Sequence, residues 1–236
     1  MKQFKALFIV LLVTLSSCSS RKSMIASQEH ISALQLGAIV ESSGLITHNL
    51  EVKTTPALEK PVRLSLQTKE FNKSTFKKHE SALQGTEGRI PYHDSLKQKP
   101  TYLTLEIVDD VVYAEMVNNH AGLLEFVEST SDARVVTAIS FAVPKGVGID
   151  KGHTFFLEAH SNNTYRIAYY SENKKVGHFS FNEINVFDYQ LSSFCWGLDK
   201  RGAAKVMDIV EEGKSCDRPL KRSPEKLKKS KNLFDY

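Results

Sequence analysis

The stretch TFFLEAHSNNTYRIAYYSENKKVGHFSFNEINVFDYQL, residues 154–191, decides the fold class of this chain. Aromatic and β-branched residues fill four short runs, and small or polar residues that favour turns separate them. Turn signals spaced roughly eight to twelve residues apart between such runs are typical of an antiparallel β-sandwich or barrel-like domain. The predicted strands are Thr154–His160, Tyr165–Tyr170, Val176–Phe181 and Ile184–Leu191, with turns at Ser161–Asn163 and Glu172–Lys174.

Alternation of apolar and polar residues continues toward the N-terminus. It is clearest in Val62–Lys69, where Val62, Leu64 and Leu66 alternate with polar residues, as in a strand with one buried and one solvated face. About eight to ten strands are expected in all. The further ones are His48–Thr54, Thr101–Val108, Val111–Val117 and Arg134–Val143, with Asp109–Asp110 as a hairpin turn.

A C-terminal helix is predicted at about Lys200–Glu212. Asp199 precedes it as an N-cap, and Gly213 ends it. The apolar residues that would share its buried face are Val206, Ile209 and Val210.

The segment Phe71–Lys99 is polar and contains Gly85, Gly88 and Pro91, which predicts a long surface excursion. Long loops in compact domains are often functional. We therefore expect a partner to be bound by this segment or by an edge of the sheet.

The first eighteen residues have the layout of an export signal. Lys2 and Lys5 precede an apolar run over Ala6–Val13, and small residues follow it. The ending Leu15-Ser16-Ser17-Cys18 resembles the lipobox of bacterial lipoproteins. That resemblance implies that Cys18 is lipidated and becomes the first residue of the mature chain. Ser19 after the cysteine implies delivery to the outer membrane.

Two other interpretations of this segment are an ordinary secretory signal and a short membrane anchor. A spanning helix needs about 20 apolar residues, and this run is interrupted sooner. The expected organisation is a signal peptide over residues 1–17, a tether over 18–43, a β-rich domain with its helix over 44–216, and a basic tail over 217–236.

Composition narrows the class of protein. A hydrophobic content of 41% and a charged content of 25% indicate a folded domain rather than a disordered chain. Of the 31 basic residues, Lys2 and Lys5 leave with the signal, so the mature chain has 29 against 27 acidic ones, a net charge of +2. Residues 214–231 hold eight basic and two acidic residues, or +6, which leaves −4 elsewhere. A nucleic-acid interface needs basic residues over a folded face, so this partner is excluded.

Cysteine usage points to one disulfide. If Cys18 is acylated, Cys195 and Cys216 are the two that remain, and an even number in an oxidising compartment favours a bridge. The bridge would connect the predicted helix to the strand before it. Two buried free thiols are the alternative.

Catalytic signatures are weak. His153, Glu158 and His160 are the nearest approach to a metal cluster, but only Glu158 and His160 share a strand face, and a site needs three or four ligands. Chance explains the three Ser-x-x-Lys matches, and the G-x-S-x-G and H-E-x-x-H motifs are absent. No cofactor is predicted.

The basic tail is the most unusual feature of the mature chain. It could contact anionic lipid or lipopolysaccharide phosphates, or it could be a solvated, disordered end. The residues that would make such contacts are Lys221, Arg222, Lys226, Lys228, Lys229 and Lys231.

The sequence therefore predicts a lipid-anchored cell-envelope protein that binds a partner or takes part in envelope assembly without catalysis. An envelope hydrolase or metal-dependent enzyme is the first alternative. A binder of anionic surfaces that acts through the tail is the second.

Overall fold

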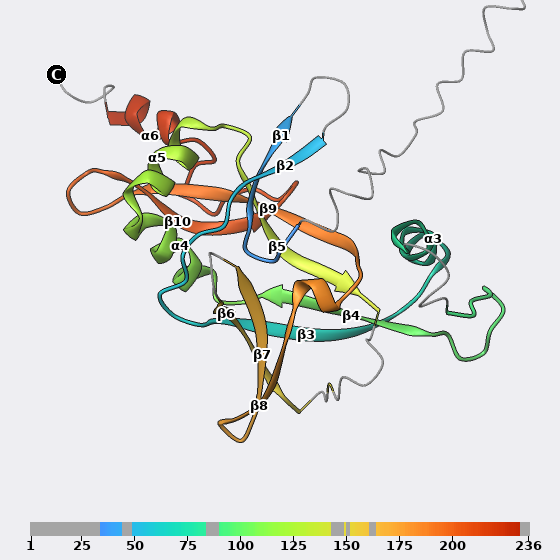
Figure 1. Ribbon diagram of the computed structural model, residues 1–236. Coiled ribbons are helices and arrows are strands. Elements are labelled where there is room, and N and C mark those ends of the chain that lie inside the picture. The colour runs from blue at the N-terminus through green and yellow to red at the C-terminus, as the bar shows by residue number, and fades with distance from the viewer. Residues whose placement is uncertain are drawn as a thin grey trace, which may run out of the picture.

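The computed structural model describes residues 34–43, 49–83, 90–142, 149, 152–160 and 164–231. The signal segment and Cys18 lie outside this part. Within it, ten antiparallel strands form one open sheet in the order β10-β9-β5-β4-β3-β6-β7-β8, and β1 and β2 join it through β5 (Figure 1). The predicted mainly β, antiparallel class is confirmed. The strands are β1 Ile39–Ser43, β2 Asn49–Thr54, β3 Val62–Glu70, β4 Thr101–Ile107, β5 Arg134–Phe141, β6 Thr154–Ala159, β7 Tyr165–Ser171, β8 Lys174–Ser180, β9 Val186–Leu198 and β10 Ala204–Glu211.

The turn predicted at Glu172–Lys174 is present between β7 and β8, whereas the one predicted at Ser161–Asn163 lies outside the described residues. Glu172 and Asn173 both have positive φ, at 47° and 65°, and they connect β7 to β8 as a two-residue hairpin. Two consecutive positive φ angles match the right-handed twist of the flanking strands. A short 3₁₀ turn, Phe181–Glu183, then leads the chain from β8 into β9.

Strand β5 is the branch point of the sheet. Its first residues pair with β1 through Ile39–Val135, whereas its later residues pair with β4 through Leu103–Phe141. Along its other side it pairs with β9, beginning at Val135–Ser192. The two partners β1 and β4 therefore lie end to end on one side of β5, with β9 on the opposite side.

Two apolar clusters occupy the two faces of the sheet. The main cluster takes in Leu103 of β4 together with buried residues of α4 (Asp110–Asn119) and α5 (Ala121–Ser129). The neighbouring Tyr102 belongs to a second cluster with Phe71 and Phe187, beneath α3 (Lys73–Ala82). Because side chains alternate along a strand, α3 covers the face opposite to α4 and α5.

The strand expected over Val111–Val117 is wrong, because α4 occupies this segment. The carboxylate of Asp109 accepts a hydrogen bond from the Val112 N–H at 3.3 Å, so it caps a helix and is not part of a hairpin turn. Tyr113, Ala114 and Val117 are buried, which is helical spacing. A short apolar run does not by itself distinguish a strand from a helix.

The helix expected over Lys200–Glu212 is also wrong, because this segment is β10. The Asp199 carboxylate does accept backbone hydrogen bonds, from Arg201 and Ala203, but within the turn between β9 and β10. A bulge between Val206 and Asp208 shifts the phase of β10, so Val206 and Ile209 are both buried. Because of the bulge, two buried residues of the strand lie three positions apart, which is also the spacing of residues on one face of a helix.

The surface excursion expected over Phe71–Lys99 contains α3. Asn72 caps this helix: its side chain accepts from the Thr75 N–H at 2.9 Å, and the Thr75 hydroxyl accepts from the Asn72 N–H. Residues 84–89 of the predicted loop lie outside the described part.

The packed domain extends beyond residues 44–216 at both ends. Leu34 and Leu36, expected in the tether, are 1% and 0% exposed in the main cluster. The predicted tail pairs with β9 through Lys221 and then forms the C-terminal helix α6 (Pro224–Lys231), which buries Leu227. No helix in the described part of the chain is both long and apolar enough to cross a bilayer.

Candidate functional site

A pocket of about 160 Å³ lies beside β9, where the sheet has a gap. The Trp196 N–H donates to the Lys221 carbonyl at 2.7 Å, and the Lys221 N–H donates to the Trp196 carbonyl at 2.9 Å. Strand β5 pairs with the same edge of β9, but its pairing ends at Val135–Ser192. Lys221 therefore pairs with β9 beyond the end of β5. The pocket lies between these two pairings, next to Ser193 and Phe194.

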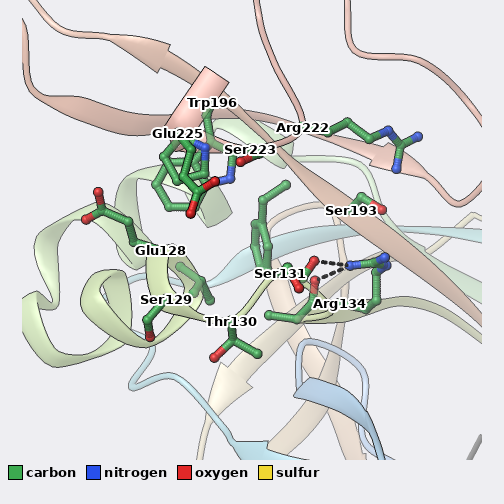
Figure 2. Close-up of a pocket in the computed structure, with 14 residues that line it drawn as sticks. Glu128, Ser129, Thr130, Ser131, Arg134, Ser193, Trp196, Arg222, Ser223 and Glu225 are labelled. Atoms are coloured by element: carbon green, nitrogen blue, oxygen red, sulfur yellow. Dashed lines mark hydrogen bonds between the residues drawn. The ribbon is translucent and has the colours of Figure 1, made fainter. Parts of the chain in front are cut away.

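Four segments that are distant in sequence build this pocket (Figure 2). They are the end of α5 with the turn after it, the start of β5, the middle of β9, and the residues that enter α6. The lining residues are Val127–Ser131, Ala133, Arg134, Ser193, Phe194, Trp196 and Arg222–Glu225.

Strand register places Arg134, Ser193 and Arg222 on one face of the sheet. Arg134 precedes Val135, which pairs with Ser192, and Arg222 follows Lys221, which pairs with Trp196. Directly opposed residues share a face and successive residues alternate. Figure 2 shows the Ser193 hydroxyl between the two guanidinium groups.

The Arg134 guanidinium is held in place by the backbone. Its Nη1 donates to the carbonyls of Ala133 at 2.9 Å and Ser131 at 3.2 Å. Its side chain is 24% exposed, and its ion pair with Asp132 is long, at 4.0 Å. The guanidinium is therefore oriented, and most of its positive charge is not neutralised by a close carboxylate.

Ser193 is a buried hydroxyl without a partner. It is 3% exposed, and its Oγ has no hydrogen bond within the described chain. The neighbouring Ser192, on the other face of β9, lies 2.6 Å from the Thr137 hydroxyl oxygen and is satisfied. Buried side-chain polar atoms are hydrogen-bonded in the large majority of cases, so Ser193 needs an explanation.

Two carboxylates, Glu128 and Glu225, lie on the other side of the pocket from the guanidinium groups (Figure 2). Glu225 is in the first turn of α6, where the helix dipole favours a negative charge. None of the lining residues is a histidine or cysteine that could act beside Ser193 as a base or nucleophile. Two guanidinium groups beside a hydroxyl are suited to binding an anionic group.

The metal candidates from the sequence are not gathered into a site. Glu158 on β6 accepts hydrogen bonds from Lys175 at 2.6 Å, Tyr170 at 2.6 Å and Arg166 at 3.1 Å. Burial raises the pKa of Glu158, but these three donors outweigh it and lower the pKa below its usual value.

The two histidines lie apart from this carboxylate network. His160 is exposed after the end of β6, and the His153 ring lies 5.4 Å from the Tyr169 ring. Among the described residues, no three His, Cys, Asp or Glu side chains are placed to hold a metal ion.

The basic residues predicted to contact an anionic surface have different positions. Lys221 pairs with Trp196, Arg222 lines the pocket, and Lys226 is exposed on α6. Lys228, Lys229 and Lys231 follow on the same helix.

The Cys195–Cys216 disulfide predicted from the cysteine count is present. Cys195 lies in β9 between the two pairings that border the pocket, and Cys216 lies in the segment between β10 and Lys221. The bridge therefore holds this connecting segment against the sheet and does not secure a helix. Its position supports the pairing of Lys221 with Trp196.

Sequence patterns did not point to Arg134 or Ser193. Arg134 begins a predicted strand, where a polar residue normally indicates a solvated face, and Ser193 lies just after the predicted strand Ile184–Leu191. The only sequence signal was the basic charge of Arg222. Comparison with protein-family models, curated proteins and solved structures finds no match to this chain, so the site is interpreted from its own chemistry.

Proposed function

We propose that this chain is a lipid-anchored protein of the cell envelope, at the outer membrane, and that its β domain binds a ligand or partner without catalysis. The observation that carries the proposal is the Cys195–Cys216 disulfide. Disulfides persist in oxidising compartments, and this pairing leaves Cys18 as the one cysteine outside the bridge. That cysteine is the one in the lipobox-like sequence.

Several acyl chains on Cys18 would hold the protein on a bilayer, because each buried methylene contributes about 0.8 kcal/mol. Only 15 residues, 19–33, separate Cys18 from Leu34, the first residue that the structure describes, and a tether of this length would keep the domain next to the membrane. The domain would then present its pocket and sheet edges to molecules of the envelope.

Two observations favour binding over catalysis. Both oxygens of Glu158, the best carboxylate candidate for a metal-dependent enzyme, accept hydrogen bonds from neighbouring strands. The pocket brings together guanidinium, hydroxyl and carboxylate groups without a general base next to the hydroxyl.

The intact mass of the membrane-extracted protein tests the proposal. After free thiols are blocked, we expect a chain that starts at Cys18, carries acyl chains, and gains two further blocking groups only after reduction. In Cys18→Ala the acyl mass and membrane retention should disappear. In the matched control Cys195→Ala/Cys216→Ala both should remain. An unmodified chain that keeps Met1 would contradict the proposal.

A second candidate is contact with an anionic surface through the C-terminal segment. It is favoured by the exposure of Lys221, Arg222 and Lys226 at one end of the molecule. Each basic residue near such a surface contributes about 1 kcal/mol, in a salt-dependent manner. Glutamine at Lys226, Lys228 and Lys229 should then weaken binding to phosphatidylglycerol vesicles at low salt, and unchanged binding would contradict this role.

A further inference from the structure

We propose that the pocket between β5, β9 and the start of α6 is a binding site for a small ligand that carries one anionic oxygen group, a phosphate or a carboxylate. Arg134, Ser193 and Arg222 hold that group. The inference rests on the geometry of the described domain and is independent of how the protein is attached to a membrane.

The first argument is the orphaned hydroxyl of Ser193. Its Oγ is buried, it lines the pocket, and it has no partner in the described chain. Leaving a buried donor unsatisfied lowers stability, and alanine would fill nearly the same space without that penalty. A ligand oxygen that accepts from Ser193 accounts for a hydroxyl at this position.

The second argument is the charge on both sides of Ser193. Arg134 comes from β5 and Arg222 from the segment before α6, and both share the sheet face of Ser193. The Arg134 guanidinium donates to the two carbonyls through Nη1, so Nε remains as a donor, as does Nη2, which lies 4.0 Å from the Asp132 carboxylate. Within the described chain, Arg222 forms no ion pair with a carboxylate. Two guanidinium groups around one hydroxyl offer the donors that phosphate and carboxylate oxygens accept.

The third argument is the size and polarity of the pocket. About 160 Å³ accommodates a group of a few heavy atoms but not a macromolecular segment with its side chains. Glu225, on the far side, disfavours a second negative charge there (Figure 2). The ligand should therefore place its anionic end against Ser193 and a neutral or cationic part toward Glu225.

Isothermal titration of the purified full chain with sodium phosphate and with sodium acetate tests the site, with chloride added to keep ionic strength constant. We expect saturable binding of at least one of the two anions, and the stronger one identifies the chemistry of the ligand. Arg222→Gln should weaken binding about tenfold, because it removes a charged donor. Ser193→Ala should weaken it about fivefold.

Arg201→Gln is the matched control, because Arg201 is exposed in the turn between β9 and β10 and the charge change is the same. It should leave the dissociation constant unchanged. A thermal scan without anion separates binding from folding: Ser193→Ala should unfold at the same temperature as the original chain or higher. The proposal is overturned if neither anion binds more tightly than chloride, if Arg201→Gln weakens binding as much as Arg222→Gln, or if Ser193→Ala binds as well as the original chain.

Discussion

The side-chain amide of Asn118 takes the place of a neighbouring strand for Val206. Its Nδ2 donates to the Val206 carbonyl at 2.7 Å, and its Oδ1 accepts from the Val206 N–H at 2.9 Å. Val206 lies in β10, an end strand of the sheet, and Asn118 lies in the last turn of α4. An exposed strand edge is a template for pairing with another chain, so this contact covers part of a vulnerable edge.

Asn118→Ala should therefore destabilise the domain and promote self-association. Two partly buried hydrogen bonds are lost, and we expect the free energy of unfolding to fall by about 1–2 kcal/mol. Urea denaturation measures the first effect and light scattering the second. Asn119→Ala, at the next and exposed position of α4, is the control and should have little effect. Equal behaviour of the two variants would show that the amide does not protect β10.

His79 should make the stability of the domain depend on pH. It is 1% exposed, both of its ring nitrogens lack a hydrogen-bond partner in the described chain, and the rings of Phe71 and Phe187 lie 5.3 and 5.4 Å away. Burial lowers the pKa of His79 more than the nearby charge of Glu80 raises it.

The unfolded chain then binds a proton at His79 more readily than the folded chain does. Stability is complete above the unfolded pKa of about 6.5 and decreases as the pH falls below it toward the folded pKa. His79→Leu should be at least as stable at pH 7 and should lose less stability between pH 7 and pH 5. Urea midpoints across that range measure this, with the exposed His160→Leu as control. A pH profile unchanged by His79→Leu would refute the assignment.

Tyr113 connects α4 to the residues before β1. Its hydroxyl donates to the Gly37 carbonyl at 2.7 Å, and its side chain is fully buried. Gly37 has a φ of +81°, which favours glycine, and a Cβ there would lie 3.1 Å from the Leu157 side chain. Tyr113→Phe leaves the buried carbonyl unpaired and should reduce the free energy of unfolding by about 1–3 kcal/mol.

Thermal or urea unfolding measures the effect of Tyr113→Phe. Tyr92→Phe is the matched control, because the Tyr92 hydroxyl bonds to Asp94 at an exposed site. It should change stability by much less, and an equal loss in both variants would argue against a special role for the Gly37 carbonyl.

The disulfide should stabilise the domain appreciably. Cys195 and Cys216 are 21 positions apart, and closing a loop of that length in the unfolded chain corresponds to about 3 kcal/mol. Cys195→Ala/Cys216→Ala should lower the urea midpoint accordingly, and addition of a reductant should lower the midpoint of the original chain toward that of the variant. If the reductant leaves the original chain as stable as before, while reduction is verified by mass, the estimate fails.

Local patterns predicted the strands better than they predicted the helices. The strands of residues 154–191 are correct because turn residues and alternation agree there, as the positive φ angles of Glu172 and Asn173 illustrate. The sequence predicts a strand over residues 111–117, which form α4, and a helix over residues 200–212, most of which form β10. The short apolar run over 111–117 fits either a strand or a helix, and the sequence does not show that Asp109 caps a helix. In residues 200–212, a bulge near Met207 places buried residues at helical spacing.

Local sequence patterns do not predict the pocket. Arg134, Ser193 and Arg222 come together through the register of β5 with β9 and the pairing of Lys221 with Trp196, which are long-range relationships. The disulfide was predictable because it follows from counting cysteines and not from locating elements.

The pairing of Lys221 with Trp196 also determines when the pocket can form during synthesis. One wall comes from residues 127–134, and the opposite wall comes from residues 222–225, which the ribosome adds 88 positions after Arg134. A growing chain that ends before Arg222 lacks this second wall. The pocket can therefore bind its ligand only after residues 222–225 have been synthesised and the segment before them has paired with β9.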